Sequence, residues 1–363
     1  MSTGDLTLQP PADGISSLTF SPDSTRLLVS SWDGTIQLHH LVAPPQPPTV
    51  FSHPAAVLTA AFGSSSTIAF SGGLDKRVRQ WDFETGQCRV LGKHEDAISS
   101  LVWSPEHNVL ITTSWDSTLK VWDPSAEIPL RSTQNLPARA YNLSYAPKSS
   151  RLLVSMAHRH VFVYDVAKLA AADGEIAPSQ ERESALKFLT RSVATMIDGK
   201  GWASGSIEGR IAVEYFDPAD QGSKYAFRAH RQNIDGVDCV YPINALAYHP
   251  IHNTFASGGS DGCISIWDHN AKKRMKLYSK YPTSISALAF SPDGAKLAIG
   301  ASYEHDNAIS KPEEQGRVMV LIKDTVMEDC KVSLNLAFCL PMPNSSIWRV
   351  WYFVVSCSEE HDR

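Results

Sequence analysis

The segment AISSLVWSPEHNVLITTSWDSTLKVWDP, residues 97–124, decides the fold, because the same pattern returns along the chain. Further copies begin at Ile15, Ala56, Ala140, Ile243 and Ile285. The aspartates that close three successive copies, Asp82, Asp123 and Asp165, follow one another at intervals of 41 and 42 residues. A period of this length, closed by a Trp-Asp dipeptide, is typical of the blades of a β-propeller.

A weaker copy begins at Lys187, between Asp165 and Asp268. That interval is 103 residues long and holds two copies, which are enlarged by insertions at 168–184 and 218–240. The number of copies is therefore seven.

Within each copy, apolar and polar residues alternate over short runs that are separated by turn sequences such as S-P-D and S-x-D-G. A four-stranded sheet of this kind cannot bury both faces alone, so the copies must stack radially. The sequence predicts an all-β fold, a single seven-bladed WD40 β-propeller over residues 1–325. Residues 5–8 read as an additional strand that closes the ring against the seventh blade, since a closed ring leaves no long open edge.

The composition excludes several classes of function. The net charge of -5 gives no broad positive field for nucleic acid or an anionic membrane. The six cysteines have no disulfide-type or zinc-type spacing, so we expect no metal and no cofactor. The first residues resemble no secretion signal, and no run of about 18 apolar residues is present, so we expect a nuclear or cytosolic protein.

The third copy contains His94, Ser114, Asp116 and Trp122, which have the composition of a nucleophilic triad. The second copy contains the same set in His53, Ser71, Asp75 and Trp81, and a repeated set favours buried structural hydrogen bonding over catalysis. No P-loop or H-E-x-x-H motif supports chemistry. We therefore expect a protein that is not an enzyme.

Two kinds of residue are candidates for binding. Trp32 and Trp115 precede the tight-turn aspartates, where exposed aromatic side chains serve as anchors, although they could instead pack on a neighbouring blade. Arg191, Arg210 and Arg228, with His230 and Arg231 beside them, suit carboxylate or phosphate ligands. For Arg231 a solvated loop charge is the alternative.

Residues 326–363 carry no repeat signature. This tail contains Trp348, Trp351, Tyr352 and Phe353, which would promote aggregation if exposed. We expect it to lie outside the propeller and assign it no function.

Several stretches resemble one family closely. They include SSWDG at 30–34, RESALKFLTR at 182–191, GSIEGRIAVEYFDP at 205–218 and KYAFRAHR at 224–231. From about residue 5 to residue 322 the chain resembles the mitotic checkpoint propellers of the budding-uninhibited-by-benzimidazole group. IEGRIAVEY followed by YAFRAHR is shared chiefly with a sister group, the nuclear messenger-RNA export propellers.

The resemblance implies a spindle-assembly-checkpoint adaptor that binds the extended GLEBS motif of a checkpoint kinase and of its pseudokinase-like relative. It assigns Trp32, Trp115, Arg191 and Tyr215 to the GLEBS motif. It assigns Arg210 and Arg228 to the phosphothreonine of phosphorylated Met-Glu-Leu-Thr repeats in a kinetochore scaffold. It also implies a monomeric propeller in the nucleus, at mitotic kinetochores and in the cytoplasm. The alternative is an export propeller that binds a nucleoporin GLEBS motif; the YPTSISALAFSPDG stretch and the acidic net charge favour the checkpoint group.

Overall fold

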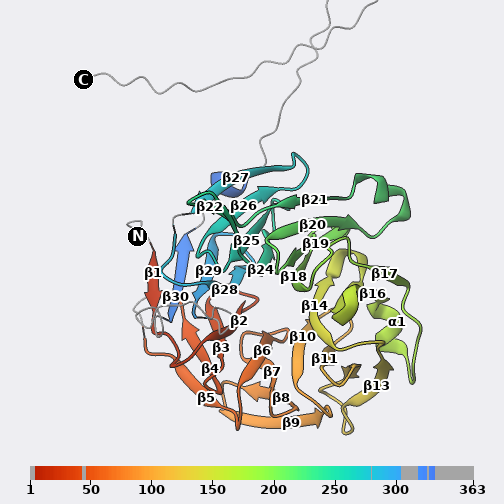
Figure 1. Cartoon of the computed structure of the whole chain (residues 1–363). Helices are drawn as coiled ribbons and strands as arrows, with labels where there is room; N and C mark the ends of the chain where they lie inside the picture. The colour runs from red at the N-terminus through yellow and green to blue at the C-terminus, as the bar shows by residue number, and fades with distance from the viewer. Residues whose placement is uncertain (1–4, 43–45, 279, 304–317, 325–326, 332–363) are drawn as a thin grey trace, which may run out of the picture.

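Each copy of the repeat forms one four-stranded antiparallel sheet, and seven such sheets surround a central axis in the computed structural model (Figure 1). The structure describes residues 5–42, 46–278, 280–303, 318–324 and 327–331. The innermost strand of each sheet contacts that of the next, and the last contacts the first, so the ring is closed. The predicted all-β, seven-bladed WD40 propeller is confirmed.

The first three blades follow the sequence without interruption. Blade 1 consists of β2 (Ile15–Phe20), β3 (Arg26–Ser31), β4 (Thr35–His40) and β5 (Thr49–Ser52). Blade 2 consists of β6 (Val57–Phe62), β7 (Ile68–Gly73), β8 (Arg77–Asp82) and β9 (Gln87–Lys93). Blade 3 consists of β10 (Ile98–Ser104), β11 (Val109–Ser114), β12 (Thr118–Trp122) and β13 (Leu130–Asn135).

The last four blades include the insertions and the closure of the ring. Blade 4 consists of β14 (Ala140–Ala146), β15 (Arg151–Met156), β16 (His160–Asp165) and β17 (Gln180–Glu183). Blade 5 consists of β18 (Thr190–Thr195), β19 (Gly201–Ser206), β20 (Arg210–Tyr215) and β21 (Tyr225–Arg228). Blade 6 consists of β24 (Ile243–Tyr248), β25 (Phe255–Gly259), β26 (Ile264–Asp268) and β27 (Lys273–Tyr278). Blade 7 consists of β28 (Ile285–Phe290), β29 (Lys296–Ala301), β30 (Met319–Asp324) and β1 (Leu6–Leu8).

The insertions form small additional elements. Helix α1 (Val166–Ala171) follows β16 and is capped by Asp165, whose carboxylate accepts hydrogen bonds from the backbone N–H groups of Ala167 and Lys168. The hairpin of β22 (Arg231–Ile234) and β23 (Val237–Val240) connects blade 5 to blade 6. Short 3-10 helices span Pro147–Ser149, Ala157–Arg159 and Pro218–Ser223. Within the described residues, no helix is long and apolar enough to cross a membrane.

The chain that follows β30 touches blade 6. Helix α2 (Met327–Cys330) lies against β26 and β27, and the buried carbonyl oxygen of Cys330 accepts a hydrogen bond of 2.8 Å from Thr254 Oγ1. Asp329 forms an ion pair of 3.1 Å with Lys276. These contacts lie beyond the boundary expected after residue 325. The rest of the expected tail, residues 332–363, falls outside the described residues.

Neighbouring blades approach each other closely where a glycine of one second strand meets an isoleucine of the next innermost strand. A Cβ atom added at Gly72 would lie 2.7 Å from Ile98 Cγ2, and one added at Gly258 would lie 2.4 Å from Ile285 Cγ2. Both isoleucines are fully buried. These positions require glycine because the neighbouring blade occupies the space of a side chain.

We predict that Gly258→Ala lowers the free energy of unfolding by about 1–3 kcal/mol, because the new methyl group overpacks the contact with Ile285. Chemical denaturation measures this change. Gly174→Ala is the control, since no atom lies within 4 Å of its added Cβ, and it should change stability by no more than about 0.5 kcal/mol. Equal effects of the two substitutions would contradict the packing argument.

The seventh blade joins the two ends of the chain. β1 pairs antiparallel with β30, with Leu6 opposite Ile322 and Leu8 opposite Val320. Leu8 is buried in the cluster between blades 7 and 1, and Lys323 Nζ lies 3.1 Å from Asp5 Oδ1. The pairing covers the edge of β30 that would otherwise be open.

Truncating Leu8 to alanine should cost about 2–4 kcal/mol, because a buried side chain at the closure is lost. Thr7→Ala, on the exposed side of the same strand, should cost at most about 0.5 kcal/mol. The two unfolding midpoints in urea test this difference. If Leu8→Ala unfolds at the wild-type midpoint, the strand contributes nothing to closure.

Candidate functional site

All seven innermost strands begin at the same end of the ring. Ser16 Oγ donates to the carbonyl oxygen of Val57 (2.6 Å), Ser192 Oγ to that of Ile243 (3.0 Å) and Asn244 Nδ2 to that of Ile285 (3.1 Å). Each bond joins the first residues of one innermost strand to the first residues of the next. We call this end of the ring the upper face and the opposite end the lower face. Since strand direction alternates within a blade, the turn between the second and third strands also lies on the upper face.

The two candidate tryptophans occupy such turns. Trp32 lies between β3 and β4, and its backbone N–H donates to the carbonyl oxygen of Gly14 (2.9 Å). Trp115 lies between β11 and β12, and its backbone N–H donates to the carbonyl oxygen of Ala97 (3.0 Å). Trp32 is 46% exposed, and Trp115 is half-buried. Their backbones are fixed while at least the Trp32 ring is available to a ligand.

The three candidate arginines all belong to the upper end of blade 5. Arg210 is the first residue of β20, Arg228 is the last residue of β21, and the two are direct partners in the register of the sheet. Arg191 is the second residue of β18, and its carbonyl oxygen accepts a hydrogen bond of 3.0 Å from Asn142 Nδ2. Residues directly opposite each other on antiparallel strands place their side chains on one face of the sheet, so the Arg210 and Arg228 side chains start from neighbouring positions on the same face.

Carboxylates only partly neutralise this pair. Glu208 Oε2 lies 3.8 Å from Arg210 Nε, which is a long ion pair, and Arg228 is exposed. Like charges opposite each other destabilise a sheet, so a bound anion would relieve the repulsion. Arg231 differs from its neighbours, because it forms an ion pair of 3.0 Å with Asp238 inside the β22–β23 hairpin.

Tyr215 lies away from the other candidates. It is the last residue of β20 and pairs with Gly201, so the strand separates it from Arg210 by about 17 Å at 3.3 Å per residue. Its side chain packs against the buried cluster between blades 5 and 6 at the lower face, and burial raises the pKa of its phenol. The structure therefore brings Trp32, Trp115, Arg191, Arg210 and Arg228 to one face and leaves Tyr215 at the other.

The sequence interpretation did not single out a set of exposed apolar side chains beside the arginines. Phe188, Leu189 and Ile207 are 53%, 43% and 37% exposed. The N–H of Ile207 donates to the carbonyl oxygen of Leu189 (3.1 Å), which joins the two turns that carry them. Ile207 in S-I-E-G occupies the same turn position as Trp32 in S-W-D-G, so an alignment of the copies could have identified it as a further candidate.

Among the described residues, three buried networks link a histidine, a hydroxyl, an aspartate and a tryptophan. In blade 2, Ser71 Oγ lies 3.0 Å from His53 Nε2 and accepts from Trp81 Nε1 at 2.7 Å. In blade 3 the corresponding hydroxyl belongs to Thr112, which bonds His94 Nε2 and Trp122 Nε1, both at 2.8 Å. The prediction that Ser114 supplies this hydroxyl is wrong. Ser114 donates instead to the carbonyl oxygen of Asp96 (3.0 Å), because its side chain points to the turn.

The third network corrects the interpretation of His230 as part of the basic set. His230 is buried; its Nδ1 lies 2.9 Å from Asp261 Oδ1 and its Nε2 lies 2.8 Å from Ser257 Oγ. Ser257 Oγ also accepts from Trp267 Nε1 at 2.8 Å. His230 therefore belongs to the interior of blade 6.

In the blade 3 network, the surroundings shift the pKa values of both the histidine and the aspartate downward. Burial lowers the pKa of His94, although Asp116 opposes the shift. Burial alone would raise the pKa of Asp116, but hydrogen bonds from His94, Thr118 and the Glu95 backbone hold it well below its usual range. The histidine is neutral and the aspartate ionised near neutrality, which suits a structural bond rather than proton transfer.

Thr112→Val should lower the free energy of unfolding by about 1–3 kcal/mol, because the buried Trp122 and His94 groups lose their shared partner. Thr113→Val serves as the control, since this buried neighbour makes only long hydrogen bonds of 3.4 and 3.5 Å. Thermal and urea unfolding of both variants test the network. A loss as large in Thr113→Val as in Thr112→Val would argue against it.

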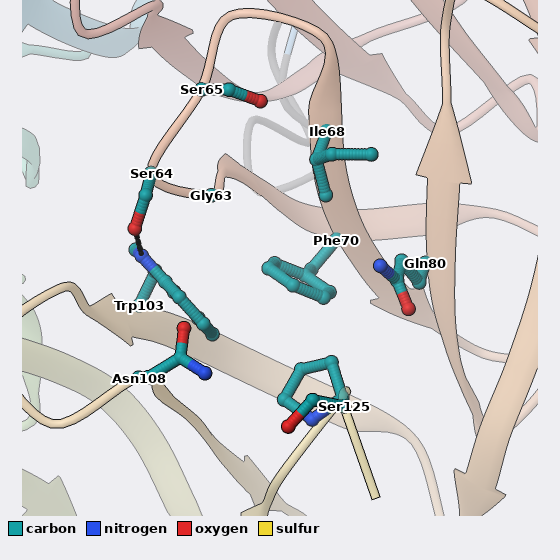
Figure 2. A pocket seen from close by; sticks show the side chains of 10 residues that line it. Gly63, Ser64, Ser65, Ile68, Phe70, Gln80, Trp103, Asn108 and Ser125 are labelled. Carbon is teal, nitrogen blue, oxygen red and sulfur yellow. Dashed lines mark hydrogen bonds between the residues drawn. The ribbon is translucent and has the colours of Figure 1, made fainter.

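A hollow of about 250 Å³ lies between blades 2 and 3 near the lower face (Figure 2). The Phe70 and Trp103 rings stack there with their centroids 5.1 Å apart, and Trp103 Nε1 donates to Ser64 Oγ at 3.0 Å. None of the six predicted site residues lines this hollow. In the part of the chain that the structure describes, no group of three or more His, Cys, Asp or Glu side chains could hold a metal ion.

Comparisons with known proteins agree with this architecture. The family model described as WD domain, G-beta repeat matches residues 6–40, 45–82, 86–123 and 224–268. The chain is 44% identical over 312 residues to the mitotic checkpoint protein BUB3.1 of Arabidopsis thaliana, an alignment that covers 84% of this chain and 89% of the relative. It is 36% identical to the mitotic checkpoint protein bub3 of Dictyostelium discoideum, covering 89% and 96%. It is 34% identical to the poly(A)+ RNA export protein of Schizosaccharomyces pombe, covering 83% and 86%.

The seven repeats, their buried networks and the residues gathered on the upper face define a WD40-repeat β-propeller of the adaptor type. The narrower family assignment comes from relatives that are 36% to 44% identical over most of the chain. The chain belongs to the family of WD-repeat propellers that contains the mitotic checkpoint proteins named BUB3.

Proposed function

We propose that this protein is a non-catalytic adaptor of the spindle assembly checkpoint, which binds GLEBS motifs of checkpoint kinases and docks them on phosphorylated Met-Glu-Leu-Thr repeats at kinetochores. The names of its relatives support the checkpoint role. The observation that carries the phosphate-dependent part is the direct pairing of Arg210 with Arg228 on the upper face.

A phosphothreonine suits this pair of arginines chemically. It carries a charge of about −1.5 to −2 and three acceptor oxygens, which two guanidinium forks can match with charge-assisted hydrogen bonds. Glu208 beside Arg210 offsets part of the positive charge, but two guanidinium groups still outweigh one carboxylate. Phosphorylation of the scaffold would therefore switch docking on.

The GLEBS motif would follow the upper face as an extended segment. In this proposal Trp32 and Trp115 supply aromatic anchors, and Arg191 pairs with an acidic residue of the motif. The exposed Phe188, Leu189 and Ile207 provide apolar contacts next to the arginines. Tyr215 has no part, because it lies at the lower end of β20.

The role implies where the protein acts. We infer a nuclear and cytoplasmic protein that is recruited to kinetochores in mitosis, with the checkpoint kinase and its pseudokinase-like relative as partners. The support comes from the names of relatives, such as the spindle assembly checkpoint protein bub3 of Schizosaccharomyces pombe, which is 32% identical.

An RNA export role is the second candidate. The relatives named poly(A)+ RNA export protein, mRNA export factor GLE2 and protein Rae1 are 34%, 30% and 30% identical over most of the chain. In this role the upper face would bind a GLEBS motif of a nucleoporin. Affinity purification from mitotic and from interphase cells separates the two, since the first predicts checkpoint kinases in the eluate and the second a nucleoporin.

The double substitution Arg210→Ala and Arg228→Ala should remove the preference for a phosphorylated Met-Glu-Leu-Thr peptide over its unmodified form. The loss of charged hydrogen bonds predicts a decrease in affinity of about tenfold or more. Isothermal titration calorimetry with both peptides measures the ratio. Arg26→Ala is the control, because its guanidinium donates to the carbonyl oxygen of Ser66 in another blade. An unchanged ratio in the double variant would refute the assignment.

A further inference from the structure

The pair of residues at the upper end of the third and fourth strands differs in charge from blade to blade. In four blades neither residue of the pair is a lysine or an arginine: the pairs are Thr35 and Ser52, Thr118 and Asn135, His160 and Glu183, and Ile264 and Tyr278. In blade 5 it is Arg210 and Arg228, and in blade 2 it is Arg77 and Lys93. Blade 2 therefore repeats the cationic pair of blade 5 at the equivalent position of the sheet.

The blade 2 pair is accessible and poorly neutralised. Arg77 is exposed, and among the described residues its guanidinium forms no ion pair. Lys93 Nζ lies 3.6 Å from Glu95 Oε1, but the two side chains are 69% and 76% exposed, so water screens the attraction. Like charges opposite each other cost stability in a sheet, and among the described residues only the screened Glu95 carboxylate forms an ion pair with either member.

Two more cations lie next to the pair. Lys76 Nζ donates to the carbonyl oxygen of Glu95, and Lys120 Nζ, from blade 3, donates to that of Lys93, both at 2.8 Å. The nearby carboxylates of Asp75 and Asp116 are buried against Arg79 and His94. In a protein of net charge -5, four positive charges around Glu95 create a local positive potential.

The site also borders the proposed peptide path. The N–H of Glu95 donates to Asp116 Oδ2 at 2.8 Å, and Asp116 follows Trp115 in the turn of blade 3. A duplex or single strand of nucleic acid gains affinity from a long row of phosphate contacts. Cations gathered at one turn, next to an aromatic anchor on a peptide-docking face, instead suit one phosphate group on a protein segment.

We propose that Arg77 and Lys93 form a second phosphate-binding site on the upper face, which takes a phosphorylated serine or threonine of an extended partner segment. The Arg77 fork and the Lys93 ammonium group hold the phosphate oxygens, and Lys76 and Lys120 strengthen the field. The peptide assignment rests on the proposed function of the upper face. The site itself rests on the register of β8 and β9.

Nuclear magnetic resonance titrations of the full chain test this site. The probes are inorganic phosphate, the peptide Gly-Ala-pThr-Ala-Gly, its unphosphorylated form and a short single-stranded RNA. We expect phosphate and phosphopeptide to shift the backbone amides of Arg77 and Lys93. Arg77→Ala with Lys93→Ala should weaken binding at these amides about tenfold or more, whereas Arg210→Ala with Arg228→Ala should leave it unchanged.

A matched control removes the same charges elsewhere. Lys273→Ala with Arg274→Ala takes one lysine and one arginine from the exposed outer strand β27 and should have no effect. Equal weakening by this control, no shift at blade 2, or tighter binding of RNA than of phosphopeptide would overturn the proposal. Phosphate binding at blade 2 without binding at blade 5 would refute the blade 5 assignment and support this one.

Discussion

Hydrogen bonds between the innermost strands of neighbouring blades fix the orientation of every other part of the ring. Short polar side chains such as Ser16, Asn142 and Ser192 reach across to carbonyl groups at the start of the next strand. A single blade cannot bury its faces alone, so each blade depends on its neighbours for its stability. The same bonds align the strand starts, and turns from blades 1, 3 and 5 therefore meet on one face.

The buried networks stabilise the residues that face the solvent. Asp116 accepts from His94 inside the blade and from the Glu95 backbone at its surface, so the turn that presents Trp115 cannot move freely. An anchor that is already ordered loses less conformational entropy on binding. In blade 5 the turn position of the aspartate is taken by Glu208, which lies beside Arg210. Blade 5, with a glutamate at this position, is also the blade that carries the arginine pair.

The repeat period determines the number of blades, and the turn sequences place Trp32 and Trp115, because both depend on local pattern alone. Positions that depend on strand direction were harder to predict. Tyr215 and Arg210 are five residues apart in sequence, yet opposite ends of β20 bring them to opposite faces. Ser114 was mistaken for Thr112, although Ser71 and Asp75 in blade 2 already gave the spacing of four residues that Thr112 and Asp116 repeat. The sequence alone did not predict the Arg77 and Lys93 pair, because only the register of β8 and β9 brings the two residues together.

The pairing of β1 with β30 also limits the order in which the protein can assemble on the ribosome. Translation proceeds from the N-terminus, so β1 emerges before the other described strands, while its partner β30 emerges after them. Until β30 emerges, the nascent chain therefore holds an incomplete ring, with blade 1 at one end and the most recently completed blade at the other. Such open intermediates with unpaired edges are prone to aggregate, so chaperones have their greatest scope for action before β30 is released.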